Sequence, residues 1–469
     1  HSHEGLFPEA FHGLVRFKSG EGYPGRVAVT GEPILVHDLA SDQRFLRTAV
    51  VARGFCSFAC VPLKVREKVL GVLDVASFNP KKPTEEDMRL LTAIGHEVGM
   101  AIENFRPRGR DYDAQSIMPM ENIRELHEAG WLRATLPHEW NGMNSNVDSE
   151  EDPSTFLQGL RMIARGCPGT AHCYQVTNHC GWAVHDLGTE EQHELFLKPM
   201  LSEPYLGTFV GSEAKRKHMY MMNTSAKKVD GGYILRGEKN YATNGSALGF
   251  AIIFAAIEGV ENFLDNHQML IVTPDMEGVS IDTSWYRPNG MRCADSPVIT
   301  LNDVFVPDSH VLGAPGDYPR KRWQGKFHLG FTANYLGATE GMYGWYLDYI
   351  VNKGKGEAEL IQMRTGEMKI KLDAAVSIFH DAIRAYRTKP IVEAELLAMA
   401  AKSIAADVAF ELSHKIIHAA GSTALFDEFP LSRYLRDLET HVLHAGHDKT
   451  AQIIGQSELK QTFDSTLQR

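Results

Sequence analysis

The order of patterns along the chain most constrains its fold. Helical periodicity runs over residues 114–205, short alternating runs between turn residues fill 206–324, and long amphipathic segments return over 325–469. Alternation with a period of two predicts strands, whereas apolar residues recurring every three or four positions predict helices. A β block between two helical blocks therefore predicts an N-terminal helical domain, a middle β domain and a C-terminal helical bundle.

Residues 1–105 carry a different pattern, which predicts a small α/β domain of their own. The run 26–39 alternates like a strand and then turns at Thr30-Gly31-Glu32-Pro33. Two further strand-like runs, 58–65 and 68–77, flank a short charged turn, as in an antiparallel hairpin. The composition of these runs predicts a sheet within this domain.

A helix is predicted to follow these strands. Thr84 with Asp87 three residues later is a capping-box spacing, which marks a helix start. The apolar residues after it fall near one face of a helix: Leu91, Ile94, Val98, Ile102 and Phe105. The charged, Pro- and Gly-bearing stretch 106–113 is predicted to be the linker to the rest of the chain.

Composition excludes several functional classes. A chain of 469 residues with a net charge of −11 offers no basic patch typical of proteins that bind nucleic acid or an anionic membrane surface. Its apolar runs all fall short of the ~18 residues that span a bilayer. The segment 1–15 lacks the layout of a signal peptide, and the six cysteines match neither a disulfide framework nor paired zinc motifs. We therefore expect a cytoplasmic protein.

Four phrases together resemble the acyl-CoA dehydrogenase superfamily of flavoproteins. They are LHEAGWLRATLPHEWNG (126–142), LGTEEQHELFLKPML (187–201), GYILRGEKNYATNG (232–245) and NGMRCADSPVITLNDVFVPDSHVLG (289–313). The resemblance covers about residues 115–460. It implies a multidomain α and β fold with a helical domain, a β-sheet or barrel-like domain and a C-terminal four-helix bundle, and it implies a homotetramer.

The N-terminal α/β domain resembles a different family, the GAF domains. PGRVAVTGEPILVHDL, CVPLKV and VLGVLDV match the second half of such a domain, so we expect the module to be incomplete at its N-terminal side. It would either bind a small effector or serve as a structural, dimerising appendage. The second alternative is favoured because no Cys-His chromophore motif is visible.

The resemblance implies a flavin, FAD or FMN, held by residues of the β block. Thr243 would sit beside the isoalloxazine, and Tyr241 would replace the family's usual Trp as a stacking wall. Ser212 and Glu213 keep the first two places of a Thr-Glu-Pro segment that lines the cofactor in the family. The alternative for Thr243 is an ordinary threonine at a sheet edge.

The C-terminal helices would hold the other end of the cofactor. The Arg-x-Phe-Gly segment by which a neighbouring subunit usually grips the adenosine end of FAD is missing, and Gln362 occupies a surviving position nearby. A later Gly-bearing turn is kept in Gly421 and Ser422. The alternative for Gly421 is a plain helix C-cap.

The segment RYLRDLETHVLHAGHDKT (433–450) carries the chemistry that divides the family. Dehydrogenases of the family place their catalytic base, a Glu, in the motif Arg-Asp-(x)6-Tyr-Glu-Gly. In this chain Ala445 occupies the position of that Glu. A second family position for the base falls near Phe331, with Glu340 nine residues further along. A base that removes a proton α to a thioester is worth ~10²–10⁴ in rate, and alanine cannot supply it.

The same segment instead resembles the flavin-dependent monooxygenases of this fold, which carry Arg-Asp-(x)6-His-Ala-x-x-Asp. Arg436, Asp437, His444, Ala445 and Asp448 all fit. By that resemblance His444 would act beside the flavin, either by hydrogen-bonding the substrate hydroxyl or the peroxide or by deprotonating a phenol, and a neutral histidine can do any of these at physiological pH. Arg436 and Asp437 would take part in the site or form an intramolecular salt bridge that fixes the helix end.

The other histidines of this segment are predicted to be exposed. His441, His444 and His447 recur at i, i+3 and i+6 and so drift around a helix, which does not suit a metal site, and none is predicted.

The leading hypothesis is thus a monooxygenase that takes reduced flavin from a separate reductase and uses O₂ on a small organic substrate. The alternatives are an acyl-CoA dehydrogenase whose base lies elsewhere and a non-catalytic sensor of small molecules.

Overall fold

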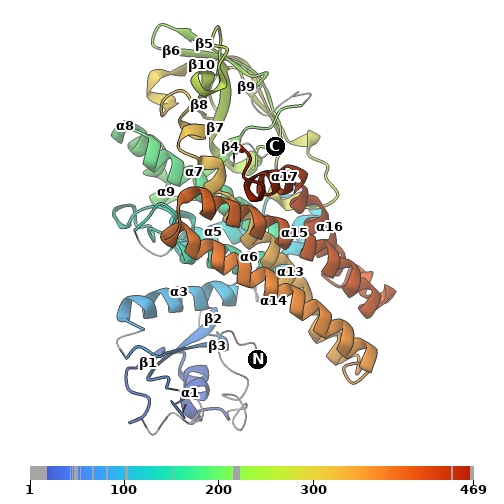
Figure 1. Cartoon of the computed structure of the whole chain (residues 1–469). Coiled ribbons are helices and arrows are strands. Elements are labelled where there is room, and N and C mark those ends of the chain that lie inside the picture. Colours follow the sequence, from blue (N-terminus) through green and yellow to red (C-terminus); the bar gives the residue numbers. More distant parts are fainter. Residues whose placement is uncertain are drawn as a thin grey trace. The chain divides into compact units, whose positions relative to one another are not determined.

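The computed structural model of the chain forms two compact units, residues 1–104 and 105–469, here called the N-terminal unit and the C-terminal unit (Figure 1). The structure describes residues 18–42, 44, 46, 51–52, 54–65, 68–80, 83–100, 104–150, 153–214, 222–444 and 447–464.

The N-terminal unit contains a three-stranded antiparallel sheet, β1 (Ile34–Val36), β2 (Ser57–Val65) and β3 (Lys68–Ser77), in the order β1-β2-β3. The predicted hairpin of β2 and β3 is confirmed by its register, from Ser57 opposite Ser77 to Val65 opposite Lys68. The predicted strand before the first turn is wrong, because residues up to Thr30 form helix α1 (Gly22–Thr30). The turn itself is present, since Gly31 ends α1 with a left-handed φ of 68°.

Helix α3 (Glu85–Met100) lies against β2 and begins at the predicted capping box. Asp87 Oδ2 accepts the Thr84 N–H at 2.6 Å, and Thr84 Oγ1 accepts the Asp87 N–H at 3.2 Å. A Cβ at Gly95 would lie 2.4 Å from the Pro62 carbonyl oxygen, so the glycine lets the helix approach the strand closely. Of the predicted apolar face, Ile102 lies outside the described residues.

The predicted linker over 106–113 is wrong. These residues form helix α4 (Arg106–Gln115), which starts with a proline in its first turn and belongs to the C-terminal unit. Its Asp113 is buried, with 7% of its surface exposed, and forms an ion pair with Arg436 at 2.5 Å. The charged composition that suggested a linker therefore serves packing between helices.

The helical block that follows contains two long helices, α6 (Ser154–Gly166) and α7 (Pro168–Leu187), after α5 (Met120–Glu128). Short helical segments α8 (Glu190–Gln192), η5 (His193–Leu197) and α9 (Pro199–Ser202) lead to the sheet. Helix α7 is buried along nearly its whole length, including polar residues such as His172, Gln175 and His179. A helix that buries polar side chains on several faces lies at the centre of its domain.

The β block forms one sheet in the order β11-β8-β7-β5-β6-β10-β9, with β4 paired to β7. Its strands are β4 (Leu206–Val210), β5 (Ser225–Val229), β6 (Gly232–Lys239), β7 (Leu248–Ile257), β8 (His267–Val272), β9 (Val279–Asp282), β10 (Val298–Pro307) and β11 (Val311–Leu312). β4 and β5 each run parallel to β7, and the remaining pairs are antiparallel. One face of the sheet buries an apolar cluster that includes Leu235, Ile253 and Val304.

The C-terminal block begins with α11 (Asp317–Arg320) and α12 (Trp323–Lys326). Three long helices follow, α13 (His328–Asn352), α14 (Glu359–Thr388) and α15 (Ile391–Ala420), then α16 (Leu431–His441), η11 (Val442–His444) and α17 (His447–Glu458) (Figure 1). Pro390 lies between α14 and α15 and caps the second. The predicted helix–sheet–helix architecture is confirmed.

A second apolar cluster joins the three blocks of the C-terminal unit. It contains side chains from α7, the sheet and α12: Trp182, Phe250, Phe254 and Trp323 among others. Aromatic rings dominate it, with the Trp182 and Trp323 centroids 5.0 Å apart. Within the part of the chain that the structure describes, no helix is both long enough and apolar enough to cross a membrane.

Candidate functional site

Thr243 lies at the centre of a buried polar cluster in the C-terminal unit. It follows β6 in a tight loop in which Tyr241 and Asn244 adopt left-handed φ angles of 65° and 72°. This loop turns Thr243 inward, leaving it 4% exposed. Its Oγ1 lies 3.2 Å from His172 Nε2 on α7 and 3.0 Å from Ser296 Oγ, which precedes β10.

His172 also meets a histidine of the C-terminal block. The His172 and His441 ring centroids are 4.7 Å apart in an edge-on arrangement, and His441 ends helix α16. Tyr335 of α13 packs edge-on against His441 at 5.0 Å and donates its hydroxyl to the His441 carbonyl oxygen at 3.1 Å. Phe331, one turn earlier on α13, lies 6.0 Å from the His441 ring. We call Thr243, Ser296, His172 and His441 the Thr–His cluster.

Both histidines of this cluster are neutral at physiological pH. Burial lowers the pKa of His172 to about 4. Burial also lowers the pKa of His441 well below its usual value, and the neighbouring His172 and the ammonium of Lys402 lower it further. The Lys402 ammonium of α15 lies 5.0 Å above the Phe331 ring and is itself buried. A neutral imidazole offers one donor and one acceptor, so each ring can donate one hydrogen bond and accept another at neutral pH.

The predicted residues Arg436 and Asp437 sit on α16 but do not form a salt bridge with each other. The Arg436 guanidinium binds Asp113 of α4 and donates to the Asn289 carbonyl oxygen at 2.8 Å. Asp437 is 1% exposed and accepts the Met291 N–H at 2.6 Å. Burial raises the pKa of Asp437 to about 7. Both side chains thus fasten α16 to neighbouring segments, and Asp437 holds the loop that leads to Ser296.

His444 ends the 3₁₀ turn η11, three residues after His441. Its side chain lies outside the described part of the structure, as do those of His447 and Asp448 and the whole of Ala445. The catalytic role of His444 therefore stays a prediction. Its neighbour His441 corrects an expectation, because it is buried (4% exposed) where an exposed histidine was predicted.

Ser212 and Glu213 lie in the segment after β4, near the start of the loop that contains Thr243. The Ser212 carbonyl oxygen accepts the Asn240 N–H at 3.1 Å. The Glu213 carboxylate forms an ion pair with Lys239 Nζ at 2.5 Å and accepts the Thr224 N–H at 3.0 Å. Both side chains of this ion pair are at most 1% exposed. Glu213 thus fixes the loop, and its role towards a cofactor stays a prediction.

Tyr241 points outward, with 54% of its surface exposed. Its ring packs edge-on against Trp285, with centroids 5.3 Å apart, and Trp285 is 41% exposed. The two rings form an aromatic pair at the surface, beside the loop that carries Thr243. Such a pair suits a stacking role for a flat ligand ring.

Gln362, Gly421 and Ser422 lie at one end of the α14–α15 pair. Gln362 is exposed and donates to the Gly356 carbonyl oxygen at 3.2 Å. Two residues on, Arg364 donates to the His418 carbonyl oxygen at 3.2 Å, close to Gly421. Gly421 caps α15 with φ 86°, and Ser422 begins η10 (Ser422–Leu425). No contact among the described residues joins this end to Thr243, and the C-cap alternative for Gly421 accounts for its geometry.

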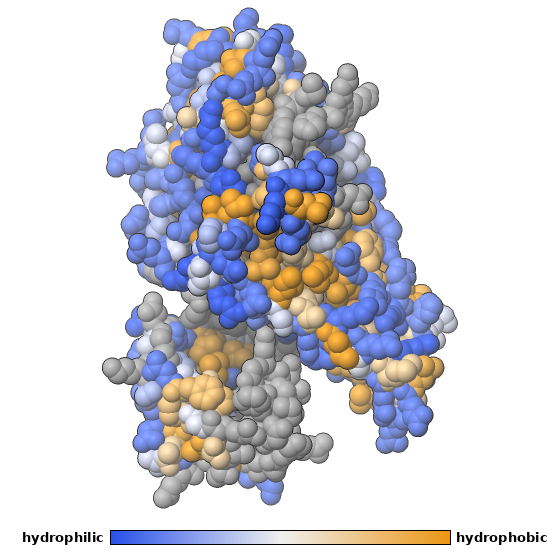
Figure 2. Space-filling model, viewed as in Figure 1, coloured by the Kyte–Doolittle hydropathy of each residue, from blue (hydrophilic) through white to orange (hydrophobic). Residues whose placement is uncertain are grey.

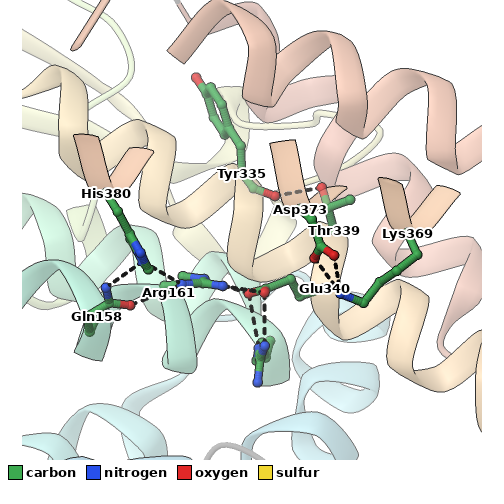
Figure 3. A network of polar contacts seen from close by, with 9 residues as sticks. Gln158, Arg161, Tyr335, Thr339, Glu340, Lys369, Asp373 and His380 are labelled. Atoms are coloured by element: carbon green, nitrogen blue, oxygen red, sulfur yellow. Dashed lines mark hydrogen bonds and ion pairs between the residues drawn. The ribbon is translucent and has the colours of Figure 1, made fainter. Parts of the chain in front are cut away.

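Glu340, the one acidic residue considered as a base on α13, is held in an ion-pair network (Figure 3). Arg161 of α6 binds both of its oxygens, at 2.5 Å and 2.7 Å, and Arg165 lies 3.0 Å away. Burial alone would raise the pKa of Glu340, but the two arginines outweigh it and bring the pKa to about 2. Figure 3 shows Tyr335 and Glu340 pointing to different sides of α13, so Glu340 faces away from the Thr–His cluster.

Sequence reasoning missed His172, Ser296 and the burial of His441. A signal for His441 was present, because it continues a buried stripe on α16 at the spacing i, i+3, i+4 and i+7: Tyr434, Asp437, Leu438 and His441. His172 carries no such local signal, since α7 is buried all round. Ser296 is recognisable only from its contact with Thr243.

Profiles of known families match both units. The profile "GAF domain" matches residues 2–103, "Acyl-CoA dehydrogenase, N-terminal domain" matches 98–204, and "Acyl-CoA dehydrogenase, C-terminal domain" matches 329–449. A curated relative is the acyl-CoA dehydrogenase, short-chain specific, of Clostridium acetobutylicum. It is 22% identical over 373 residues, which cover 76% of this chain and 93% of the relative.

Solved structures show the same fold. Butyryl-CoA dehydrogenase from Megasphaera elsdenii superposes with a TM-score of 0.71 at 22% identity, covering 80% of this chain and 98% of that one. FMN-bound TdsC from Paenibacillus sp. A11-2 superposes with a TM-score of 0.71 at 20% identity and the same coverage. The chain therefore carries a GAF domain followed by the N- and C-terminal domains of an acyl-CoA dehydrogenase, and it shares the fold of these flavoproteins.

Proposed function

We propose that the chain is a flavin-dependent monooxygenase that uses reduced flavin and O₂ to oxygenate a small organic substrate. The observation that carries the proposal is the buried pair of neutral histidines, His172 and His441, beside Thr243. Of the two positions where dehydrogenases of this family place a carboxylate base, one corresponds to Ala445 and the other falls near Phe331. Glu340, the remaining candidate, stays ionised between two arginines and is too weak a base at a pKa of about 2.

The residues around Thr243 fit a flavin. The Gln175 amide, one turn along α7 from His172, and Asn240 Oδ1 are buried without a hydrogen-bond partner in the described parts of the chain. Buried polar groups left unpaired cost about 1–3 kcal/mol each, and a ring system rich in carbonyl and N–H groups would supply partners. Tyr241 and Trp285 offer an aromatic wall. When bound in its reduced form, the flavin supplies the electrons that activate O₂.

The Thr–His cluster would manage the proton that this chemistry requires. Thr243 Oγ1 bridges His172 and Ser296, which gives a chain of hydrogen bonds through the site. Burial keeps His172 and His441 neutral, so each imidazole would donate or accept a hydrogen bond in the site, and the exchange of a proton with a substrate hydroxyl would fall to His444. Surrounding rings, Phe331 and Tyr335, keep bulk water away from this exchange.

An acyl-CoA dehydrogenase is the second candidate, and Asp437 is the observation that favours it. This buried carboxyl has a pKa of about 7, which suits a general base. However, Asp437 Oδ1 holds the Met291 N–H at 2.6 Å, so deprotonating a substrate would compete with a structural bond. The relative from Clostridium acetobutylicum is named as an acyl-CoA dehydrogenase, which keeps this candidate in the test.

The proposal includes partners. Reduced flavin would come from a separate reductase, and the subunits would assemble as a homotetramer through the C-terminal helices. Figure 2 shows hydrophobic residues among the polar ones along these helices. Val351 of α13 and Met363 and Ile370 of α14 are 69%, 57% and 71% exposed, and a neighbouring subunit would cover them. A monomer in light scattering at micromolar concentration would contradict the assembly.

Oxygen consumption tests the proposed activity. The full chain is mixed with free reduced FMN or FAD and oxygen, with and without candidate aromatic substrates. A monooxygenase gives oxygenated product carrying label from ¹⁸O₂. A dehydrogenase instead bleaches its bound flavin when an acyl-CoA is added without oxygen, and neither response would favour a ligand-binding protein without catalysis. Product without ¹⁸O, or bleaching of the bound flavin by an acyl-CoA, would overturn the proposal.

A further inference from the structure

A thiol pair and a buried arginine lie next to the Thr–His cluster, and the proposed activity uses none of them. Cys167 stands between α6 and α7, and Cys293 lies in the 3₁₀ turn η8 (Arg292–Ala294). Their Sγ atoms are 3.8 Å apart, within hydrogen-bond reach for sulfur, although 126 residues separate them in sequence. Both are buried, at 0% and 2% exposure.

The packing holds this pair in place. A Cβ at Gly169, in the first turn of α7, would lie 2.3 Å from Cys293 Sγ, so the thiol rests directly on the helix backbone. Cys173, one turn further on, donates its thiol to the carbonyl oxygens of Cys293 and Ala294 at 4.0 Å and 3.8 Å. The N-terminal part of α7 therefore contacts η8 through the sulfur atoms of these cysteines.

Arg433 of α16 brings a charge to this otherwise apolar contact. It is 4% exposed, and its Nη2 donates to the Gly166 carbonyl oxygen at 3.2 Å, next to Cys167. Its Nε and Nη1 have no hydrogen-bond partner, and no carboxylate lies at ion-pair distance among the residues that the structure describes. Asp437, one turn along α16, acts on it only at longer range. A buried arginine requires a compensating anion.

Cys167 is the group placed to supply that anion. The hydrogen bond with Cys293 lowers the pKa of Cys167, burial opposes this, and the charge of Arg433 lowers it further. Its position at the start of the 20-residue helix α7 adds the favourable end of the helix dipole. The same hydrogen bond raises the pKa of Cys293, which therefore keeps its proton.

We propose that Cys167 and Cys293 form a redox-active pair, in which peroxide oxidises Cys167 beside Arg433 and Cys293 then closes a disulfide between α7 and η8. The Cys167 thiolate attacks one oxygen of hydrogen peroxide, the O–O bond breaks, and the leaving hydroxide takes up a proton to give water. Cys293 sulfur then attacks the Cys167 sulfenic acid, the S–O bond breaks, and a second water leaves with the Cys293 proton. Two thiols and one peroxide thus give one disulfide and two waters.

The disulfide would act on the candidate site. An S–S bond is about 2.0 Å long, so the sulfur atoms must approach by about 1.8 Å. Cys293 lies three residues before Ser296, whose hydroxyl contacts Thr243, and two residues after Met291, which Asp437 holds. A shift of η8 towards α7 therefore pulls on the segment that carries Ser296.

Peptide mapping of the full-length chain tests the proposal. The reduced protein is treated with hydrogen peroxide, blocked with an alkylating reagent and digested without reductant. We expect a peptide pair linked through Cys167 and Cys293, two hydrogens lighter than the reduced pair. Cys173→Ser is the matched control, since it removes the neighbouring buried thiol and should leave the link unchanged. Recovery of both Cys167 and Cys293 as alkylated thiols, or a link to Cys173 instead, would overturn the proposal.

Two further variants separate the roles of the pair. In Cys293→Ser, a sulfenic-acid probe such as dimedone should label position 167, whereas Cys167→Ser should give no label at 293. Arg433→Met should slow oxidation about tenfold, because a thiol at its usual pKa is only a few per cent ionised at pH 7. Arg433→Lys, which keeps the charge, should restore the rate. Labelling at 293, or an unchanged rate in a folded Arg433→Met protein, would refute the assignment of Cys167 as the oxidised sulfur.

Discussion

Replacing Glu340 by Gln separates a structural carboxylate from a catalytic one. In Glu340→Gln, the neutral amide leaves Arg161 and Arg165 without their buried counter-charge. A carboxyl pKa lowered from 4.5 to about 2 corresponds to about 3 kcal/mol of stabilisation of the charged form. Removing one partner of a buried pair costs about 3–5 kcal/mol by experience with other proteins, which agrees.

The pH dependence of stability follows from the same ion pair. Because the folded pKa is depressed, Glu340 contributes its full stability above about pH 4.5, the unfolded value, and loses it as the pH falls towards about 2. Wild type should therefore lose about 3 kcal/mol across this window through Glu340, and Glu340→Gln should lack that part of the acid sensitivity.

Urea unfolding followed by tryptophan fluorescence measures this change, since all 6 tryptophans lie in the C-terminal unit. Asp373→Asn is the matched control. Figure 3 shows Asp373 paired with Lys369, but both side chains are about half exposed, so we expect a loss below about 0.5 kcal/mol. An unchanged urea midpoint in Glu340→Gln together with complete loss of turnover would refute our interpretation and make Glu340 the base.

Four further predictions concern the site. His444→Ala should leave flavin binding intact but lower the yield of oxygenated product per O₂ consumed about 10²-fold. The electrons of the reduced flavin should then reduce oxygen to hydrogen peroxide, and the product yield per O₂ consumed measures this. Thr243→Val should break the bridge to His172 and weaken flavin affinity by about tenfold, measured by fluorescence titration, with an unchanged affinity as the contrary result. Gln175→Leu should raise thermal stability of the flavin-free protein and lower its affinity for flavin; lower stability would show an overlooked partner. Stability should fall as the pH drops below about 6.5, because His172 and His179, with pKa values lowered by burial to about 4 and about 3, must take up protons; urea midpoints from pH 8 to 4 check this.

Local patterns predicted the elements well where one signal dominated. The α14 and α15 periodicities and the β2–β3 hairpin stand as expected, because each pattern is long and repeats one period. Helix α1 was missed because its valines alternate. Tyr23 and Val27, four residues apart, are buried at 1% and 0%, whereas Val29 is 60% exposed, so the helical spacing decided the outcome.

Only some residues of the candidate site could be predicted from the sequence. Tyr241 and Thr243 belong to one short phrase, so a local resemblance could find both. His172 lies 71 residues before Thr243 and meets it only through packing of α7 against the sheet. Arg436 illustrates the same limit, since its partner Asp113 is 323 residues away, in a stretch whose charges suggested a linker. Pairings at such separations leave no trace in a single sequence.

The Thr–His cluster draws on four segments that lie far apart along the chain: His172, Thr243, Ser296 and His441. Contacts at such separations form late in folding, since closing long loops costs entropy before the contacts form. A chain leaving the ribosome therefore cannot assemble this cluster until α16 has emerged. Flavin uptake should consequently report completed folding of the C-terminal unit, and chains that end before α16 should be unable to bind flavin.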